Sequence, residues 1–543
     1  MQSLVLLKME RRMTKIKKRR IVIIIAVLSL IIITAGSTVA FLRSRGYHSN
    51  FQDQRNWQVY AGSEETAAKQ SQGVLQMNVG IGNKWINQQE KTDFEASVSV
   101  RIQTNPVSVG EVELPDAGLL FRVQEDSLSD GTDVVDGYYF GIDLYKQQVF
   151  LKQGDRASQK WQEIATKQHL IEADTDYRLT VKVAGNHIIG FVDERKDSWP
   201  VIDVVAEDFA EGLIGVQNQQ LQTAFTKFSI KGYEESEGKE ATYQNPLLPE
   251  IADPDVLYWE GTYYLYATTP GTNIGGIKVY TSKDLVNWED AGMAMTAGPD
   301  NWGTEGFWAP DLIEKDGRFY MYYTANEHLC VSIADNPLGP FKQENVGPMH
   351  EDIQEIDAHA YLDDDGQYYL YFVRFNNGNL IYGAKLNDDM QTIDEESIVE
   401  VLAPSQAWEQ DMANINEGPY MLKHKGKYYL TYSGSHFESP LYGAGYAVSD
   451  SPLGPFEKYT ENPIMQSNSL VHGAGHHAVA ESPDGKELFM IYHRHQTLYS
   501  TDPREFAIDR MRFTENAKGE TVLQVYGPTV TPQPYPSGAT GKE

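Results

Sequence analysis

A unit of two short strands joined by a tight turn occurs five times in the second half of this chain. Each copy has a polar head, a short apolar strand, a turn that contains glycine, and a returning strand with alternating aromatic residues. The copies are ADPDVLYWEGTYYLYATT from Ala252, APDLIEKDGRFYMYYT from Ala309, IDAHAYLDDDGQYYLYF from Ile356, NEGPYMLKHKGKYYLTYS from Asn416 and GHHAVAESPDGKELFMIYH from Gly475. Units at this spacing predict a radial array of blades, because each unit buries its apolar face only against its neighbours.

The polar heads carry the functional interest of the repeat. Aligned on Asp253, Asp311, Asp357, Glu417 and His476, they are separated by 58, 46, 60 and 59 residues. This spacing predicts a five-bladed β-propeller, in which the innermost strands run side by side along the axis and the heads converge on one pocket. Asp and Gly between paired strands are ordinary turn residues, but the heads precede the first strand of each unit.

The charge of the chain limits the classes of partner. The formal net charge is −30, although residues 1–20 hold eight Lys or Arg and one Glu. An acidic, Tyr-rich body argues against nucleic acid, whose phosphates need a basic surface, and fits neutral ligands such as sugars. The single Cys330 excludes an intrachain disulfide framework.

The N-terminus carries a basic segment followed by an apolar one. Residues 1–20 are expected to form a basic cytoplasmic tail, and residues 21–42 a transmembrane signal anchor, since 22 uncharged residues span roughly 33 Å as a helix. The positive-inside rule then places the body outside the cell. The predicted localisation is the cell membrane, single-pass, with the large acidic body extracellular. A signal peptide cleaved near Ala40, which would give a secreted form, is the alternative.

The expected architecture is all-β. A tether is expected over 43–54 and a β-sandwich of jelly-roll type over 55–235, because strand patterns dominate there and no long amphipathic helix appears. A charged linker over 236–243 precedes the propeller, 244–530, and a tail, 531–543. The strand order of the sandwich resembles concanavalin-like or laminin-G-like modules, including carbohydrate-binding module family 66. Such a module either binds sugar or packs against the neighbouring domain.

Four motifs occur in order at blade spacing: NPLLPEIADPDV, WAPD, NEGP and GAGHH. Together they resemble glycoside hydrolase family 43 over the region from Asn245 to about Tyr526. By motif, the resemblance implies that Asp253 is the general base and Glu417 the general acid. It also implies that Asp311, in WAPD, tunes the pKa of the acid and holds the sugar.

The chemistry of glycoside cleavage is consistent with those roles. An inverting enzyme needs an acid to protonate the leaving oxygen and a carboxylate, roughly 6.5–9.5 Å away, to activate water on the opposite sugar face. Heads on different blades across a central pocket can supply such a gap. The acid needs a raised pKa, which a neighbouring anion provides by like-charge repulsion.

Other residues are candidates for binding. His476 falls where the family often has an axial histidine, sometimes beside calcium or another ion. We treat it as a candidate for substrate contact, packing or a largely water-held metal, and no cofactor is required. Further candidate substrate contacts are Trp308, Asp357, His359, Trp408 and Arg512, the last with a buried ion pair as its alternative.

The leading hypothesis is a membrane-tethered, inverting glycoside hydrolase acting on plant-type pentose-containing oligo- or polysaccharides. The family's commonest assignments are exo-acting β-xylosidase and α-L-arabinofuranosidase. Endo-arabinanase and fructan or galactan hydrolase are alternatives, although the WMNDPNG-like motif of fructosidases is absent. A non-catalytic surface glycan-binding protein is the alternative of another class. The oligomeric state is unknown from sequence.

Overall fold

The computed structural model describes residues 47–49, 51, 56–60, 69–71, 73–80, 82–103, 115–129, 132–235, 241–268, 275–516 and 518–539. Within these ranges the regular elements are β-strands and three short 3-10 helices, η3 (Glu125–Ser127), η4 (Glu395–Ser397) and η5 (Ala407–Glu409). The all-β prediction is therefore confirmed. No helix among the described residues is long and apolar enough to cross a membrane, and the predicted tail and anchor, 1–42, lie outside them.

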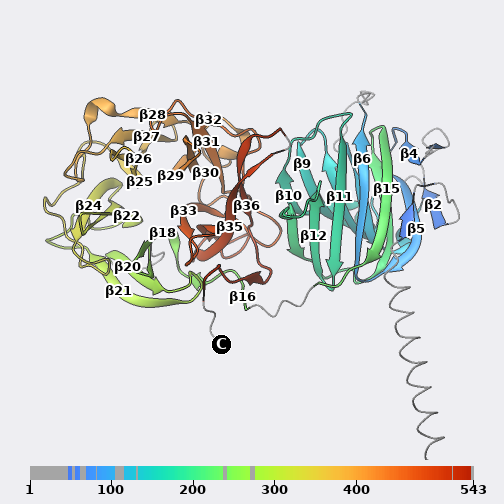
Figure 1. Ribbon diagram of the computed structural model, residues 1–543, viewed down its shortest axis with the longest axis horizontal. Helices are drawn as coiled ribbons and strands as arrows, with labels where there is room; N and C mark the ends of the chain where they lie inside the picture. The colour runs from blue at the N-terminus through green and yellow to red at the C-terminus, as the bar shows by residue number, and fades with distance from the viewer. Residues whose placement is uncertain are drawn as a thin grey trace, which may run out of the picture.

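The N-terminal domain is a sandwich of two antiparallel sheets (Figure 1). One sheet has the order β13 (Ile202–Val205), β12 (His187–Val192), β11 (Asp176–Ala184), β6 (Phe94–Ile102), β15 (Thr223–Gly232), β4 (Val74–Met77), β3 (Lys69–Ser71), with β1 (Tyr47–Ser49) also on β15. The other has the order β10 (Lys160–Gln168), β9 (Gln148–Asp155), β8 (Gly137–Asp143), β7 (Asp116–Val123), β14 (Gly212–Gln219), β5 (Asn83–Lys91), β2 (Trp57–Tyr60).

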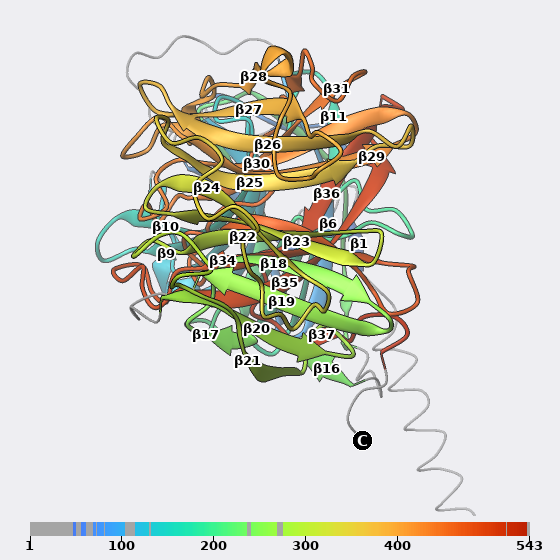
Figure 2. The same ribbon diagram turned by 90° about the vertical axis from the view of Figure 1, so that its left-hand side faces the viewer.

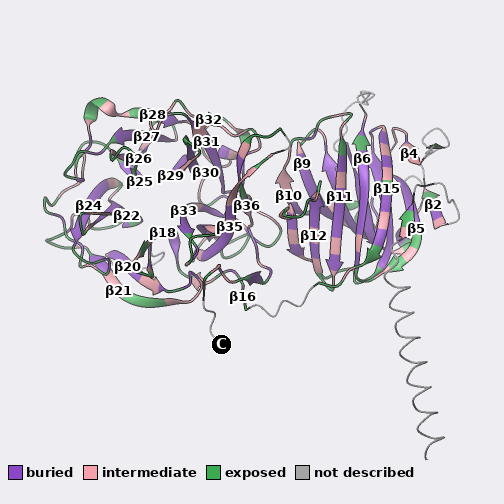
Figure 3. Ribbon diagram, viewed as in Figure 1, coloured by how far each residue is buried: buried purple, intermediate pink, exposed green. Residues whose placement is uncertain are grey.

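The sandwich begins earlier than the sequence predicted. The predicted tether, 43–54, includes strand β1, and Phe51 is fully buried in the sandwich core beside Trp57. The tether is therefore wrong for residues 47–49 and 51. Strands β7, β8 and β14 are buried on both faces, because a second, smaller apolar cluster that includes Leu120 and Phe150 covers the outer face of their sheet. Figure 3 shows that much of β6 and β11 in the facing sheet is buried as well.

The C-terminal domain contains five blades around a common centre (Figure 1). The first blade consists of β18 (Ala252–Trp259), β19 (Thr262–Thr268), β20 (Gly276–Ser282) and β21 (Trp288–Thr296), and the second of β22 (Trp308–Lys315), β23 (Arg318–Ala325) and β24 (His328–Ala334). The third consists of β25 (Glu355–Leu362), β26 (Tyr368–Phe375), β27 (Asn379–Lys385) and β28 (Val399–Leu402). The fourth consists of β29 (Asn416–His424), β30 (Lys427–Gly434), β31 (Gly443–Ser449) and β32 (Glu457–Lys458). The fifth is β33 (Gly475–Glu481), β34 (Leu488–Arg494), β35 (Glu505–Glu515), β36 (Thr521–Tyr526) and β17 (Leu248–Pro249). The predicted five-bladed propeller is confirmed.

The ring is closed by strands from both ends of the domain. Strand β17, which precedes the first blade, pairs with β35 of the fifth, and β16 (Thr242–Tyr243) pairs with β37 (Gln533–Pro534). Thr531 and Gln533 are buried in this closure. The predicted tail, 531–543, is therefore wrong for residues 531–539, and the predicted linker is wrong at Thr242 and Tyr243, because backbone pairing between the two ends holds both segments.

The sandwich packs against the fifth blade (Figure 1) and lies behind the propeller in the view of Figure 2. Strand β10 contributes hydrogen bonds to the loop before β33: Gln466 Nε2 donates to the carbonyl of Thr166 over 2.6 Å, and the backbone N–H of Ser469 donates to that of Ile164 over 2.7 Å. On the other side of the interface Trp199 stacks on Tyr526, with ring centroids 5.8 Å apart.

The five innermost strands share one irregularity, which sets the direction of the heads. Each of β18, β22, β25, β29 and β33 contacts the next around the ring. Each also has a bulge near its start, where the register of its hairpin shifts. The residues with positive φ at the bulges are Asp253 (49°), Ala309 (43°), Asp357 (57°), Gly418 (53°) and His476 (43°). A bulge bends the strand and redirects a side chain, so these positions turn together toward the axis.

Candidate active site

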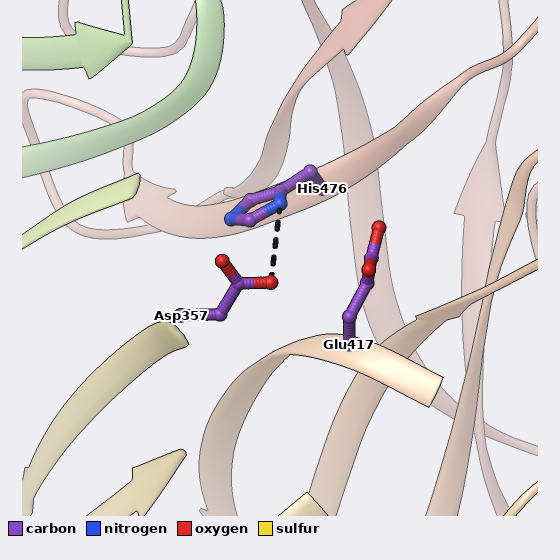
Figure 4. A group of neighbouring side chains, drawn as sticks. All are labelled: Asp357, Glu417 and His476. Atoms are coloured by element: carbon purple, nitrogen blue, oxygen red, sulfur yellow. Dashed lines mark ion pairs between the residues drawn. The ribbon is translucent and has the colours of Figure 1, made fainter. Parts of the chain in front are cut away.

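A cavity of about 920 Å³ lies over the ends of the innermost strands, and all five blades contribute to its lining. Its floor contains four of the polar residues that the repeat singled out: Asp253, Asp357, Glu417 and His476. Figure 4 shows the last three, which come from the third, fourth and fifth blades and lie close together at one end of the axis. The heads therefore converge, as the propeller prediction required.

Asp253 is held as an anion by its surroundings. Its Oδ1 lies 2.9 Å from Nη1 of Arg504 and 3.3 Å from Nδ1 of His476, and its backbone N–H donates to Nδ1 of His493 over 3.2 Å. Burial alone would raise the pKa of this carboxyl, but the Arg504 guanidinium and the two histidines hold the pKa well below its usual range. A carboxylate that stays ionised can accept a proton from water.

Glu417 has the opposite electrostatic environment. Its side chain is buried, and burial together with the negative charge of Asp253 raises the pKa to about 7. Two hydrogen bonds oppose this shift: Tyr442 Oη donates to Oε1 over 2.8 Å, and Asn379 Nδ2 donates to Oε2 over 2.9 Å. A carboxyl with this pKa carries its proton over most of the acid range and can give it to a ligand.

Asp357 lies between these two carboxyl groups in the ring. Its Oδ2 accepts a hydrogen bond from the backbone N–H of Gly418 over 3.2 Å and lies 3.9 Å from Nδ1 of His476. Oxygen atoms of Asp357 and Glu417 lie within 4.8 Å of each other. Burial raises the pKa of Asp357 well above its usual value, and the negative charges of Glu417 and Asp253 raise it further.

The structure places Asp311 outside the cavity lining, contrary to the role expected from the WAPD motif. The bulge residue of its strand is Ala309, so Asp311 lies two residues further along the strand, at the level of Asp255 in the first blade. Its Oδ1 pairs with Nδ1 of His359 over 2.7 Å, and its Oδ2 accepts from the backbone N–H of Ala360 over 2.9 Å. Asp311 thus joins the second blade to the third.

His359 belongs to the same deeper layer and does not line the cavity. Its ring stacks on Tyr420, with centroids 4.2 Å apart, and is buried. Asp255 accepts a hydrogen bond from the backbone N–H of Leu312 over 2.9 Å, which repeats between blades one and two the contact that Asp311 makes between blades two and three. Inter-blade packing occupies the ring of His359, so its position gives no support to the predicted substrate contact.

His476 lies on the axis, and its ring nitrogen and oxygens of Asp357 and Glu417 form a group within 4.8 Å of one another. Calcium prefers six to eight oxygen ligands, and this group offers carboxylate oxygens from only two side chains. An ion bound there would also have to displace the proton that Glu417 carries. The donor set therefore fits calcium poorly, and the reaction steps that we assign to Asp253 and Glu417 use no metal.

The aromatic candidates separate into two groups. Trp308 lines the cavity and is 39% exposed, so one face is free for a ligand, and Phe307, Phe375 and Phe437 line it as well. Trp408 instead packs on Tyr432, with centroids 5.7 Å apart, and its ring fills the space beside Gly434. Trp408 is therefore a packing residue.

Arg512 lies at the contact between the propeller and the sandwich and does not line the cavity. Its guanidinium lies over the ring of Trp199, 3.9 Å from the centroid, and Nη1 donates to the carbonyl of Asp197 over 2.9 Å. These contacts join the propeller to the sandwich. The predicted substrate contact is therefore wrong, and the alternative, a buried ion pair, is replaced by a cation–π contact.

Sequence reasoning missed three residues that contact the catalytic candidates: Arg504, Asn379 and Tyr442. They come from the residue before β35, the start of β27 and the loop before β31. None lies in a head, so the repeat contains no signal for them. Arg504 could have been suspected, since the cavity needs a cation to balance its carboxylates.

The arrangement provides an acid and a base in one water-accessible cavity. Asp253 and Glu417 differ strongly in proton affinity although both are carboxyl groups, because Arg504 pairs directly with Asp253, whereas on Glu417 burial outweighs the weaker effect of Arg504. A pair of groups whose environments separate their pKa values is the usual basis for acid–base catalysis.

Comparison with known proteins adds independent information. Residues 243–518, just over half of the chain, match the profile described as Glycosyl hydrolases family 43. A solved structure titled "Crystal structure of a thermostable family-43 glycoside hydrolase" is 40% identical, with a TM-score of 0.51, and the match covers 55% of this chain and 100% of that one.

Two curated relatives each match about half of this chain or somewhat less. The Beta-D-galactofuranosidase xynD of Aspergillus niger is 27% identical over 50% of this chain and 82% of its own length. A Xylosidase/arabinosidase of Bacteroides ovatus is 27% identical over 42% of this chain and 82% of its own length. Neither match covers more than half of this chain.

Proposed function

Because the chain belongs to glycosyl hydrolase family 43 and is a glycosidase, we propose that it is an inverting, exo-acting enzyme for pentose-containing glycans. β-Xylosidase or α-L-arabinofuranosidase is the proposed activity. The single observation that carries the proposal is the contrast between Asp253, held ionised, and Glu417, held protonated, on the floor of one cavity.

We assign the general base to Asp253. Its carboxylate removes a proton from a water molecule as that water attacks the anomeric carbon. Arg504 and His476 keep the carboxylate oriented and charged before the substrate arrives. The base needs no raised pKa, because the reaction needs it to be ionised.

We assign the general acid to Glu417, which protonates the glycosidic oxygen as the bond to the sugar breaks. Donating that proton leaves Glu417 as a carboxylate, and the hydrogen bonds from Tyr442 and Asn379 then stabilise the new charge. The bond between the anomeric carbon and the leaving oxygen breaks while the bond to the water oxygen forms, so the product has the inverted configuration.

We assign the role of raising the pKa of Glu417 to Asp357 and not to Asp311. Asp357 is the carboxyl group that lies within 4.8 Å of Glu417 on the cavity floor, whereas Asp311 is paired with His359 below it. Like-charge repulsion falls with distance, so we propose that Asp357 adds to the effect of burial and of the Asp253 charge, which raise the pKa of Glu417.

The relatives support the substrate class. The Bacteroides ovatus relative is named a xylosidase/arabinosidase, and the Aspergillus niger relative acts on a galactofuranoside according to its name. The cavity is concave and its aromatic lining includes Trp308, which suits a terminal sugar that stacks on one face. Galactofuranoside cleavage is the second candidate. The Aspergillus niger relative carries that name and is as identical to this chain as the Bacteroides ovatus relative is.

The N-terminal apolar segment supports a location at the cell membrane. We propose that residues 21–42 anchor the protein in the membrane with both domains outside the cell, on the basis of the uncharged apolar run that follows KIKKRR. Protease treatment of intact cells that express the full chain tests it. Digestion of the propeller from outside would support the proposal, and complete protection would refute it.

A panel of nitrophenyl glycosides tests the activity. The full-length protein is assayed with β-D-xyloside, α-L-arabinofuranoside, β-D-galactoside and β-D-galactofuranoside, alongside Asp253→Ala. Release of nitrophenol from one pentoside that is lost in the variant supports the proposal. Turnover of the galactofuranoside alone would favour the second candidate. No turnover of the panel, followed by cleavage of arabinan or xylan, would replace exo with endo action, and inactivity on polymers as well would refute catalysis.

A further inference from the structure

Glu417 is held from two sides by different kinds of donor. Asn379, on the Oε2 side, lines the cavity and is open to a ligand. Tyr442, on the Oε1 side, is completely buried and does not line the cavity. A bound sugar therefore can replace the contact with Asn379 but cannot reach Tyr442, whose hydrogen bond stays with the enzyme through the reaction.

The ring of Tyr442 occupies a closely fitted site. Fully buried, it stacks on His493 with centroids 5.7 Å apart and an interplanar angle of 9°. A Cβ atom on Gly475 would lie 2.4 Å from the Tyr442 ring, closer than any side chain tolerates. Likewise, a Cβ atom on Gly473 would lie 2.1 Å from the ring of His495. The two glycines of the GAGHH motif thus provide space for two rings behind the cavity.

The same stack extends to the second catalytic candidate. Nδ1 of His493 accepts a hydrogen bond from the backbone N–H of Asp253 over 3.2 Å. Asp253 is the residue whose positive φ forms the bulge of the first blade. One end of the Tyr442–His493 pair therefore contacts the side chain of Glu417, and the other end contacts the backbone that presents Asp253.

We propose that Tyr442 is a positioning residue for the reaction: its hydroxyl fixes the Glu417 carboxyl, and its stack on His493 ties the position of Glu417 to that of Asp253. The inference rests on the proposed function, since it concerns the acid and base assigned there. It also gives the Gly475 position a role in catalysis, because only glycine leaves room for the ring.

The hydroxyl of Tyr442 affects the two charge states of Glu417 differently. A donor to an ionised carboxylate forms a stronger hydrogen bond than a donor to a neutral carboxyl. Burial raises the pKa of Glu417 to about 7, and the Tyr442 hydrogen bond works against that rise. Loss of the hydroxyl should therefore raise the pKa of the acid and weaken it as a proton donor.

Tyr442→Phe tests this with almost no change in shape. We expect the basic limb of the kcat/KM profile to move up by about one pH unit, the usual effect of one hydrogen bond to a charged group. At the plateau we expect kcat to fall more for alkyl than for nitrophenyl leaving groups, because a weaker acid assists poor leaving groups less. Gly475→Ala, which keeps the hydroxyl but displaces the ring, should also lower kcat and move the same limb.

Tyr492→Phe is the matched control. Tyr492 is likewise fully buried, and its hydroxyl donates to the buried Asp509 over 2.7 Å, away from the cavity. Its removal should lower the thermal midpoint without moving the pH profile. Thermal unfolding of all three variants shows whether each is folded, and if Tyr442→Phe does not fold, Gly475→Ala provides the test.

The outcomes separate the inference from the function on which it rests. A Tyr442→Phe profile that coincides with the wild type, or a Tyr492→Phe profile that moves equally, would overturn the positioning role and leave the glycosidase intact. A wild-type protein that cleaves no glycoside or polymer would overturn the proposed function, and the inference with it.

Discussion

Replacing Asp357 by Asn should move the basic limb of the pH profile downward. The substitution removes a negative charge whose oxygen lies within 4.8 Å of an oxygen of Glu417 and leaves the shape of the side chain unchanged. At that separation two charges repel by about 3.5 kcal/mol for an effective dielectric constant near 20, which corresponds to about 2.5 pKa units. Since burial and its neighbours also raise the pKa of Asp357, the charge is only partly present near neutral pH, and we expect about one to two units.

The assay is kcat/KM against pH for the glycoside that the wild type cleaves best. The acid must carry its proton, so activity is lost as the pH rises through the pKa of Glu417, about 7. In Asp357→Asn that loss should begin at lower pH and reduce the rate at pH 7 by about 5-fold to 50-fold for poor leaving groups. The rate well below the new limb should be much less affected.

Asp311→Asn is the decisive control, because the WAPD motif assigns the tuning role to that residue. Its carboxylate pairs with His359 and the backbone of Ala360 in the layer below the cavity. We expect a lower thermal midpoint, from weakening a buried contact worth ~1–3 kcal/mol, and an unchanged pH profile. A shifted limb in Asp311→Asn together with an unshifted limb in Asp357→Asn would refute the reasoning.

Four further predictions follow from the site and the domain interface. In the wild type the acidic limb of kcat/KM should lie below pH 4, because Asp253 must be ionised and its pKa is held well below the usual value; an acidic limb above pH 5 would contradict this. Glu417→Gln should lower turnover of alkyl glycosides by about 10²–10⁴-fold and that of dinitrophenyl glycosides far less; equal losses would exclude it as the acid. Trp308→Ala should raise KM about tenfold through loss of a stacking contact, whereas Trp408→Phe should not. Arg512→Ala should lower the thermal midpoint, by loss of ~0.5–2 kcal/mol of cation–π contact, without changing KM.

Most of the propeller fold could be predicted from the repeated hairpin units in the sequence. Five hairpin units with heads at similar spacing require a closed ring, and the heads at Asp253, Asp357, Glu417 and His476 do meet at its centre. The alternating strands before them correctly indicated a sandwich. Both results follow from side-chain periodicity, which depends on local geometry and needs no knowledge of tertiary contacts.

The register of the second blade could not be found in the same way. Aligning the heads on their carboxylates placed Asp311 with Asp253, but the bulges show that Ala309 is the equivalent position. A bulge adds a residue to one strand without leaving a reliable mark in the sequence. An aspartate two positions along therefore points to a different layer, where it serves the packing between blades.

The remaining errors concern contacts between distant segments. Arg504 reaches Asp253 only because the fifth blade closes against the first, and Tyr442 reaches Glu417 across the fourth blade from the loop before β31. Arg512 and residues 531–539 are held by pairing partners that lie hundreds of residues away, in the sandwich and at the start of the propeller. Such partners are set by the closure of the ring and the docking of the domains, which local sequence patterns do not record.

The configuration of the first product tests the central claim most directly. The full-length enzyme is mixed with its best nitrophenyl glycoside in an NMR tube, and the anomeric proton of the released sugar is followed before mutarotation. With Glu417 as acid and Asp253 activating water, the first sugar to appear must have the configuration opposite to that of the substrate. A first product of retained configuration would require a covalent intermediate on the enzyme and would contradict the account.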